Sequence, residues 1–285
     1  MLTILSGFAL VSMNACMRVG LQTVDPFVAQ FFRYGFGLLI ALPLLVRGGF
    51  GWLRPNNLKG QLWRGLAQTL AITLFNIALR HIALADAVAI MFTVPFAVLI
   101  GAWLFLGEKV NASRWLASAL GLAGVLIVLS PKLSGSGSVA WSLVLLSSVP
   151  LWAATFLITK SLTRDDPPRT IVAWQNLSIS AMTLPAALLL WQTPGPTELL
   201  LLAGAGLFGT LGHWALTRAF ALAEISALQP VRFLDLLWSA LYGIVLFGDP
   251  PVLATLIGGI VIVSATVWLA RSEAAARRRA DLVDD

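Results

Sequence analysis

Ten apolar stretches alternate with short polar breaks along the chain, and this alternation is its strongest pattern. The length of each stretch is close to the about 20 mostly apolar residues that a membrane-spanning helix needs. The breaks carry turn-forming or charged residues, among them Asp25-Pro26, Gly107-Glu108-Lys109 and Asp249-Pro250-Pro251. The predicted spans cover residues 3–22, 26–46, 62–81, 84–106, 114–131, 139–161, 169–191, 198–220, 225–247 and 251–271. The pattern predicts an all-α membrane protein with ten transmembrane helices.

Composition supports the membrane class, because 58% of the 285 residues are apolar, 11% are charged and the mean hydropathy is +0.87. The first stretch begins without a basic segment and leads directly into further spans, so we expect a retained helix and not a cleaved signal peptide. The single cysteine, Cys16, argues against a disulfide framework and a thiolate metal site. We expect no metal and no cofactor.

Lysine and arginine in the short loops predict the orientation of the spans. With the N-terminus in the cytoplasm, only Arg18, Arg80 and Lys132 lie at outer ends. Fourteen lie at inner ends: Arg47, Arg54, Lys59, Arg64, Lys109, Arg114, Lys160, Arg164, Arg169, Arg218, Arg271, Arg277, Arg278 and Arg279. This asymmetry predicts that both termini are cytoplasmic, in a multi-pass protein of the cell inner membrane. Because the basic residues are spread over several loops, no nucleic-acid partner is expected.

The two halves of the chain resemble each other. Residues 78–86 are similar to residues 215–224, and Phe-Leu-Gly-Glu108 corresponds to Leu-Phe-Gly-Asp249. Five spans are an odd number, so the second half must enter the membrane from the opposite side. We therefore expect inverted five-helix repeats at 1–133 and 139–271, joined by a linker at 134–138. A charged cytoplasmic tail at 272–285 should form a short helix that frays into disorder. In such proteins the substrate site lies between the repeats near the membrane midplane.

The chain resembles the EamA-type family of the drug/metabolite transporter superfamily. The resemblance rests on Arg33-Tyr34, Ala83-Leu-Ala-Asp86, Pro95 followed by Gly107-Glu108, and Phe247-Gly248-Asp249. It implies a ten-helix permease for small organic metabolites such as amino acids, nucleoside-like compounds, vitamins or, in some members, cationic drugs. Asp249 replaces a common glutamate, and Trp174 lies near the position that corresponds to the arginine of span 2. This asymmetry suggests that one half makes most of the substrate contacts.

Three charged residues, Arg33, Arg232 and Asp235, lie away from the ends of their predicted spans, where an arginine or aspartate costs about 2.5–3.5 kcal/mol on insertion scales. Arg232 and Asp235 are three positions apart on one helix, so they can pair either as a structural ion pair or as a cavity-facing coupling element. Arg33 either extends to the outer headgroups, pairs with Asp235, or contacts substrate. The net embedded charge of +1 favours a carboxylate-bearing or zwitterionic, amino-acid-like substrate.

Other polar and aromatic side chains inside the spans are candidates for substrate binding or for contacts between helices. The candidate substrate-binding residues are Asn14, Arg33, Asn76, Trp152, Gln175, Trp214, Gln229, Arg232, Trp238 and Tyr242. Asp235 and His213 are candidates for proton coupling. Pro95 and Pro230 occur in corresponding spans and are candidates for hinges, with a static bend as the alternative.

The leading function is secondary transport by alternating access, with no catalytic residues. The alternatives are import or exchange of a nucleoside-like or vitamin-like metabolite, and efflux of cationic drugs. An intramembrane enzyme is disfavoured because neither a H-E-x-x-H cluster nor a paired nucleophile and base occurs in the sequence. A channel or receptor is disfavoured by the inverted repeat. The expected partners are a small-molecule substrate and membrane lipid, and the expected assembly is a monomer or homodimer.

Overall fold

The computed structural model describes residues 1–47, 49–79, 81, 84–130, 139–247 and 253–284, and its ordered elements are all helical. The first half contains α1 (Leu2–Gly20), α2 (Pro26–Arg47), the short η1 (Phe50–Leu53), α3 (Leu58–Leu79), α4 (Leu84–Met91), α5 (Val94–Leu106) and α6 (Ala112–Leu129). The second half contains α7 (Val139–Leu162), α8 (Pro168–Leu189), α9 (Pro196–Leu222), α10 (Ile225–Leu228), η3 (Pro230–Leu234), α11 (Asp235–Phe247) and α12 (Leu253–Asp284).

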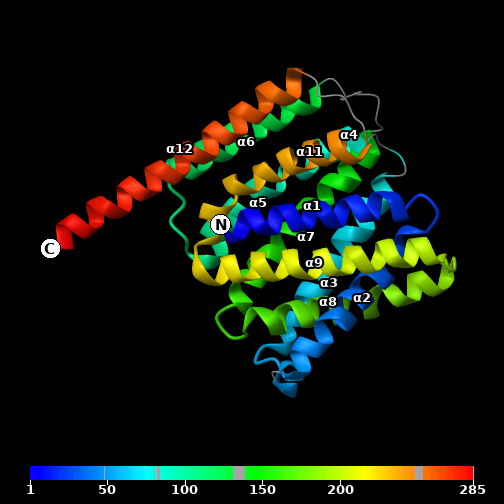
Figure 1. The fold of residues 1–285 in the computed structure, drawn as a ribbon. Coiled ribbons are helices and arrows are strands. Elements are labelled where there is room, and N and C mark those ends of the chain that lie inside the picture. The colour runs from blue at the N-terminus through cyan, green and yellow to red at the C-terminus, as the bar shows by residue number, and fades with distance from the viewer. Residues whose placement is uncertain (48, 80, 82–83, 131–138, 248–252, 285) are drawn as a thin grey trace.

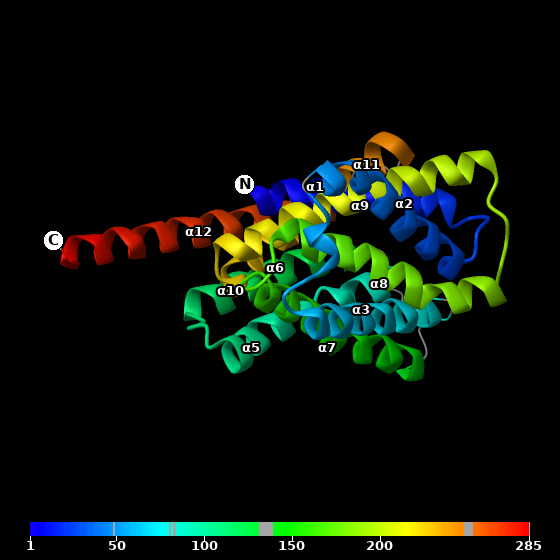
Figure 2. The ribbon, with the colours of Figure 1, turned by 90° about the horizontal axis from the view of Figure 1, so that it is seen from below.

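The helices agree with the ten predicted spans. Within the described ranges, eight segments are long and apolar enough to cross a membrane, and Leu256–Ser272 is a shorter apolar helix. Span 225–247 is divided among α10, η3 and α11, so it does not count as one long helix. The two termini lie at the same end of the bundle in both views, as an even number of spans requires (Figures 1 and 2). The chain is a multi-pass helical membrane protein.

The fourth and ninth spans, each predicted as one helix, are interrupted in the structure. Phe92 and Thr93 separate α4 from α5, and Pro95 lies in the first turn of α5. Gln229 precedes Pro230, which begins η3. Proline has no N–H to donate and its ring clashes with the carbonyl four residues earlier, so it favours the start of a helix over its interior. The predicted hinge candidates therefore mark breaks at corresponding places in the two halves.

Helix packing shows the two-fold relation between the halves. The repeat pairs α1 with α7, α2 with α8, α3 with α9 and α6 with α12. The structure packs α2 against α8 and α6 against α12, and it makes the two exchanged pairs, α1 with α9 and α7 with α3. Figure 1 shows α6 and α12 side by side and α1 along α9. Of these four contacts, two join equivalent helices of the two halves. The other two are the same contact made once in each direction, which is the arrangement of an inverted repeat.

Two glycines allow α6 and α12 to cross closely. A Cβ at Gly124 would lie 2.8 Å from the carbonyl oxygen of Gly258, and a Cβ at Gly258 would collide with the carbonyl oxygen of Gly124. These obstacles are backbone atoms, which cannot rotate away. The glycine-bearing last spans of the two halves therefore form one tight contact between the repeats.

The tail continues the helix of the last span. The sequence predicts a short, fraying helix at 271–285, and in the structure α12 runs through Asp284 and extends away from the bundle (Figure 1). Its sequence after Arg271 is rich in alanine and arginine, which are strong helix formers. The predicted linker at 134–138 and the motif residues Arg80, Ala83, Gly248 and Asp249 lie outside the described residues.

Candidate functional site

A cavity of about 880 Å³ lies between the two halves of the bundle. Its volume falls within the range of roughly 300–1,000 Å³ that is usual for small-molecule sites. The lining includes Arg18 and Leu21 at the outer end of α1, Leu79 at the end of α3 and Leu129 at the end of α6. The cavity therefore extends from the middle of the bundle to the end that the loop charges predict to be outer, and with that topology the described conformation is outward-facing.

The opposite, cytoplasmic end is closed by polar contacts between the halves. The Glu108 carboxylate follows α5 and accepts hydrogen bonds from the backbone N–H groups of Ile225, at 2.9 Å, and Ser226, at 3.0 Å. A carboxylate at the N-terminus of α10 satisfies N–H groups that have no partner within the helix. Arg114 donates to Glu224, which again joins the two halves, and Lys160 donates to two carbonyl oxygens at the end of α9 within the second half. We call Glu108, Arg114, Lys160 and Glu224 the inner latch.

The three predicted embedded charges all line the cavity. The predicted pair is confirmed, since Arg232 Nε lies 4.0 Å from the Asp235 carboxylate. The Arg232 guanidinium also lies 4.4 Å from the centre of the Phe156 ring. Arg33 donates from Nη1 to Gln30 and lies 4.1 Å from the centre of the Tyr34 ring, so its partners are on α2. Both arginines stack on aromatic rings of the cavity wall.

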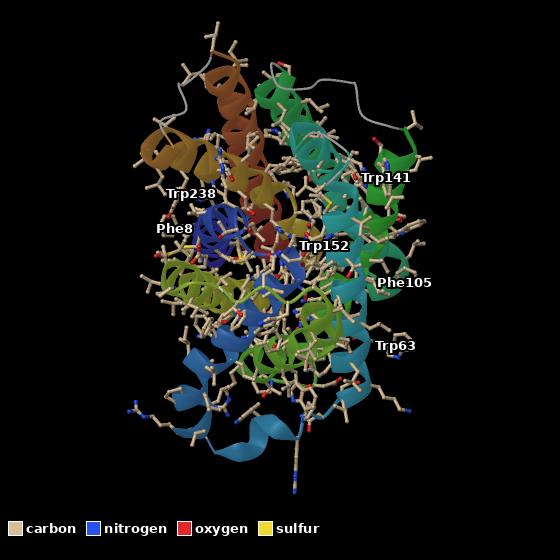
Figure 3. The ribbon with its side chains drawn as sticks, turned by 90° about the vertical axis from the view of Figure 1, so that its right-hand side faces the viewer. Phe8, Trp63, Phe105, Trp141, Trp152 and Trp238 are labelled. Atoms are coloured by element: carbon tan, nitrogen blue, oxygen red, sulfur yellow. The ribbon has the colours of Figure 1, made fainter. Side chains whose placement is uncertain are left out.

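Three buried N–H groups on the cavity wall have no hydrogen-bond partner among the described residues. They are Arg33 Nε, the Asn76 side-chain amide and Trp152 Nε1, from α2, α3 and α7. Viewed from the outer end, Trp152 lies in the interior, whereas Trp63 and Phe105 lie at the periphery (Figure 3). A buried donor without an acceptor costs about 1–3 kcal/mol, so this wall is suited to a ligand that supplies acceptors.

Half of the residues predicted for the site line the cavity: Asn14, Arg33, Asn76, Trp152, His213, Arg232 and Asp235. His213 and Trp214 are adjacent on α9, and only His213 is on the cavity wall. This difference follows from the turn of about 100° between successive residues of a helix.

The other predicted site residues lie outside the lining. Gln175 is fully buried in a hydrogen-bond network with Arg64 and Gln68. Gln229 donates to the carbonyl of Ile225. The remaining five are Trp214, which lies beside Arg218; Trp238 and Tyr242, which contact Phe8; and Pro95 and Pro230, which begin helical segments. Most of these polar groups therefore join helices to one another.

Five polar side chains of the cavity wall are not among the residues predicted for the site: Arg18, Gln30, Tyr34, Gln68 and Ser239. Tyr34 and Gln68 line the cavity, although Tyr34 was noted only as a mark of the family. Arg64 was assigned to an inner loop, whereas it lies inside α3 with 2% of its surface exposed. The signal was available, since Gln61, Arg64 and Gln68 recur at helical spacing and predict a polar face on this helix.

The lining also provides aromatic surfaces, namely Tyr34, Phe75, Phe92, Trp152 and Phe156. In the part of the chain that the structure describes, no three His, Cys, Asp or Glu side chains come together. The cavity therefore offers stacking, apolar contact, hydrogen bonding and the charges of Arg33, Arg232 and Asp235 to a solute. An outward-open binding cavity between inverted halves, closed at the other end, defines a membrane transporter.

The chain belongs to the EamA-like transporter family, whose sequence profile matches residues 1–130 and 139–271. It is 34% identical to a riboflavin transporter of Rhizobium johnstonii over 88% of this chain and 83% of that protein. It is 31% identical to a riboflavin transporter of Vibrio cholerae over 98% of this chain and 94% of that protein. An S-adenosylmethionine uptake transporter of Rickettsia bellii is 28% identical to it, over 92% of this chain and 90% of that protein.

A crystal structure of a protein that is 18% identical has the same fold, with a TM-score of 0.82 over 97% of this chain and 98% of that one. The family match and the two riboflavin-transporter relatives confirm, at the level of the family, the resemblance inferred from Arg33-Tyr34 and Gly107-Glu108. The chain is a transporter and not an enzyme.

Proposed function

We propose that this transporter takes up a riboflavin-like vitamin across the cell inner membrane. The observation that carries the proposal is the outward-open cavity, whose wall combines aromatic surfaces with three N–H donors that have no protein partner. Riboflavin has a flat tricyclic ring with carbonyl oxygens and ring nitrogens along one edge. The ring can stack on the aromatic side chains, and its polar edge can accept from the donors.

The relatives support this choice over the amino-acid-like substrate that the embedded charge favoured. Two of them are named as riboflavin transporters, and both align over most of this chain. The vitamin-like alternative thus becomes the leading proposal for the substrate.

S-adenosylmethionine is the second candidate, because relatives that take it up align over nearly the whole chain. Its sulfonium group is cationic. Among the described residues, the cavity wall carries the cationic side chains of Arg33 and Arg232 and the carboxylate of Asp235. Like charges in a poorly solvated cavity repel, so the lining favours neutral riboflavin over the cation.

The experiment is counterflow in proteoliposomes. Vesicles loaded with unlabelled riboflavin should accumulate external labelled riboflavin transiently and saturably, while empty vesicles should not. S-adenosylmethionine and a set of amino acids are added as competitors. Saturable counterflow of either competitor class without riboflavin counterflow would overturn the proposal. A second series with an imposed pH gradient tests coupling, for which Asp235 and His213 on the cavity wall are the candidates.

A further inference from the structure

A chain of four buried side chains connects the interior of the bundle to the cavity wall. Arg64 donates from Nη2 to Gln175 Oε1 at 2.8 Å, Gln175 Nε2 donates to Gln68 Oε1 at 3.3 Å, and Gln68 Nε2 donates to the Tyr34 hydroxyl at 3.0 Å. At most 2% of each residue is exposed. We call this chain the polar relay. It links α3, α8 and α2, and its last two members line the cavity.

The direction of the polar relay is fixed by its first member. A guanidinium has N–H donors and no acceptor, so the Gln175 atom that faces Arg64 must be the carbonyl oxygen. The Gln175 amide nitrogen then faces Gln68 and requires an oxygen there. The same step places the Gln68 amide nitrogen against Tyr34, whose hydroxyl must accept. Reversing either amide would place two donors or two acceptors against each other in a buried site.

Tyr34 is thereby left with its own proton to donate. Among the described residues, no acceptor lies within hydrogen-bond distance of its hydroxyl, and the side chain is part of the cavity wall. We infer that the Tyr34 hydroxyl is a fourth hydrogen-bond donor to the substrate, and that Arg64 is a positioning residue that acts through Gln175 and Gln68. The inference rests on the proposed function for the identity of the ligand.

The polar relay sets the specificity of the site. Together with Arg33 Nε, the Asn76 amide and Trp152 Nε1, it makes a wall that presents donors from four residues. A substrate edge with adjacent acceptors, such as the carbonyl oxygens and unprotonated ring nitrogens of a flavin, complements such a wall. On that edge the flavin has four acceptor atoms and one N–H, which lies between the two carbonyl groups.

One isosteric substitution reverses the direction of the hydrogen bond between Gln68 and Tyr34 at the end of the polar relay. In Gln175→Glu, the carboxylate still accepts from Arg64, but it also presents an oxygen to Gln68. Gln68 must then turn its amide nitrogen toward residue 175 and its oxygen toward Tyr34, so that Tyr34 donates to Gln68 and not into the cavity. Asn176→Asp is the matched control, because it introduces a carboxylate at the next position of α8, where Asn176 bonds only Thr210.

The test measures riboflavin binding to purified wild type, Tyr34→Phe, Gln175→Glu and the double variant by quenching of riboflavin fluorescence. Each single substitution should raise Kd about fivefold to tenfold, as expected for one lost hydrogen bond to a ligand. The double variant should bind no more weakly than Tyr34→Phe, and Asn176→Asp should bind like wild type. A further loss in the double variant, or unchanged binding by Gln175→Glu, would overturn the inference.

A second readout does not depend on the ligand. The chain has two tyrosines, so Tyr242→Phe leaves Tyr34 as the only one. The C–O stretching band of ring-labelled tyrosine differs between a hydroxyl that accepts and one that donates to protein. Gln175→Glu should shift this band, and an unshifted band would contradict the relay even if riboflavin is not the substrate. If Gln175→Glu does not fold, Gln68→Glu imposes the same reversal on Tyr34.

Discussion

At the scale of single residues, Trp152 contributes two different surfaces to the site. Its indole ring is part of the aromatic wall, and its Nε1–H is one of the donors without a protein partner. Asn76 and Arg33 add donors from two other helices. The donors on the cavity wall therefore come from both halves, and no single helix carries all of them.

Trp152→Phe separates the two contributions, because it keeps an aromatic ring and removes the N–H. We expect riboflavin Kd to rise about threefold to tenfold, which corresponds to the roughly 0.5–1.5 kcal/mol of one hydrogen bond. The measurement is fluorescence titration of the purified variant. Trp103→Phe is the control, since Trp103 is 62% exposed on the outer face of α5. Equal changes in Kd for the two substitutions would contradict the assignment of Trp152 to the binding site.

The energetic cost of burial explains which site residues could be predicted from sequence. Arg33, Arg232 and Asp235 were recognisable because charges inside a span require an internal environment. The rotation of a long helix was harder to predict. Some predicted residues lie in spans, as the cavity residues do, but face neighbouring helices: Gln175, Trp238 and Tyr242. Which way such a side chain faces depends on how the helices pack, and the sequence pattern does not give that packing.

At the scale of elements, the broken spans place short segments at the inner latch. Glu108 follows α5 and binds the first N–H groups of α10, so the two interrupted spans meet at the closed end of the cavity. The ten spans could be predicted because hydropathy and turn residues record them. Proline alone does not predict the breaks, because Pro150 and Pro185 remain within α7 and α8. Pro95 and Pro230, which begin new segments, stood out because they occur in corresponding spans.

Glu108→Gln should weaken the inner latch, because an amide presents one acceptor oxygen where the carboxylate presents two. We expect the population to shift toward an inward-open state. In a Cys16→Ser background, Thr217→Cys lies on the wall of a small buried chamber beside Arg64 and His213. Its reaction with a membrane-impermeant thiol reagent from the cytoplasmic side should accelerate severalfold with Glu108→Gln. Lys109→Gln, at the exposed neighbouring residue, should leave the rate unchanged.

Gly124→Leu should disrupt the crossing of α6 and α12, because its side chain would meet the backbone of α12. Overpacking of this kind costs about 1–3 kcal/mol or more, so we expect a Tm several degrees lower in detergent. Ala123→Leu is the matched control, as Ala123 is exposed on the same helix. The role of this crossing would be contradicted if both variants melted at the wild-type temperature.

At the scale of the whole molecule, the cavity and the inner latch together describe one state of a transport cycle. The cavity reaches the outer ends of α1, α3 and α6, and the latch closes the opposite end. Because the two halves are inverted copies, exchanging their conformations would open the inner end and close the outer one.

The orientation can be tested with single cysteines in the Cys16→Ser background. Leu21→Cys is at the outer mouth of the cavity and should react with an impermeant thiol reagent added to intact cells. Thr163→Cys, just after α7, should react only after the membrane is permeabilised. The reverse pattern would invert the topology that the loop charges predict.

The packing of the halves also bears on how such a chain arose. The contacts of α2 with α8 and of α6 with α12 join equivalent helices, and the α1–α9 contact recurs as α7–α3. Two copies of one ancestral half, inserted in opposite directions, could have made the same contacts as a homodimer. Joining the copies into a single gene would then have freed each half to diverge, and Trp174, near the position equivalent to Arg33, is one trace of that divergence.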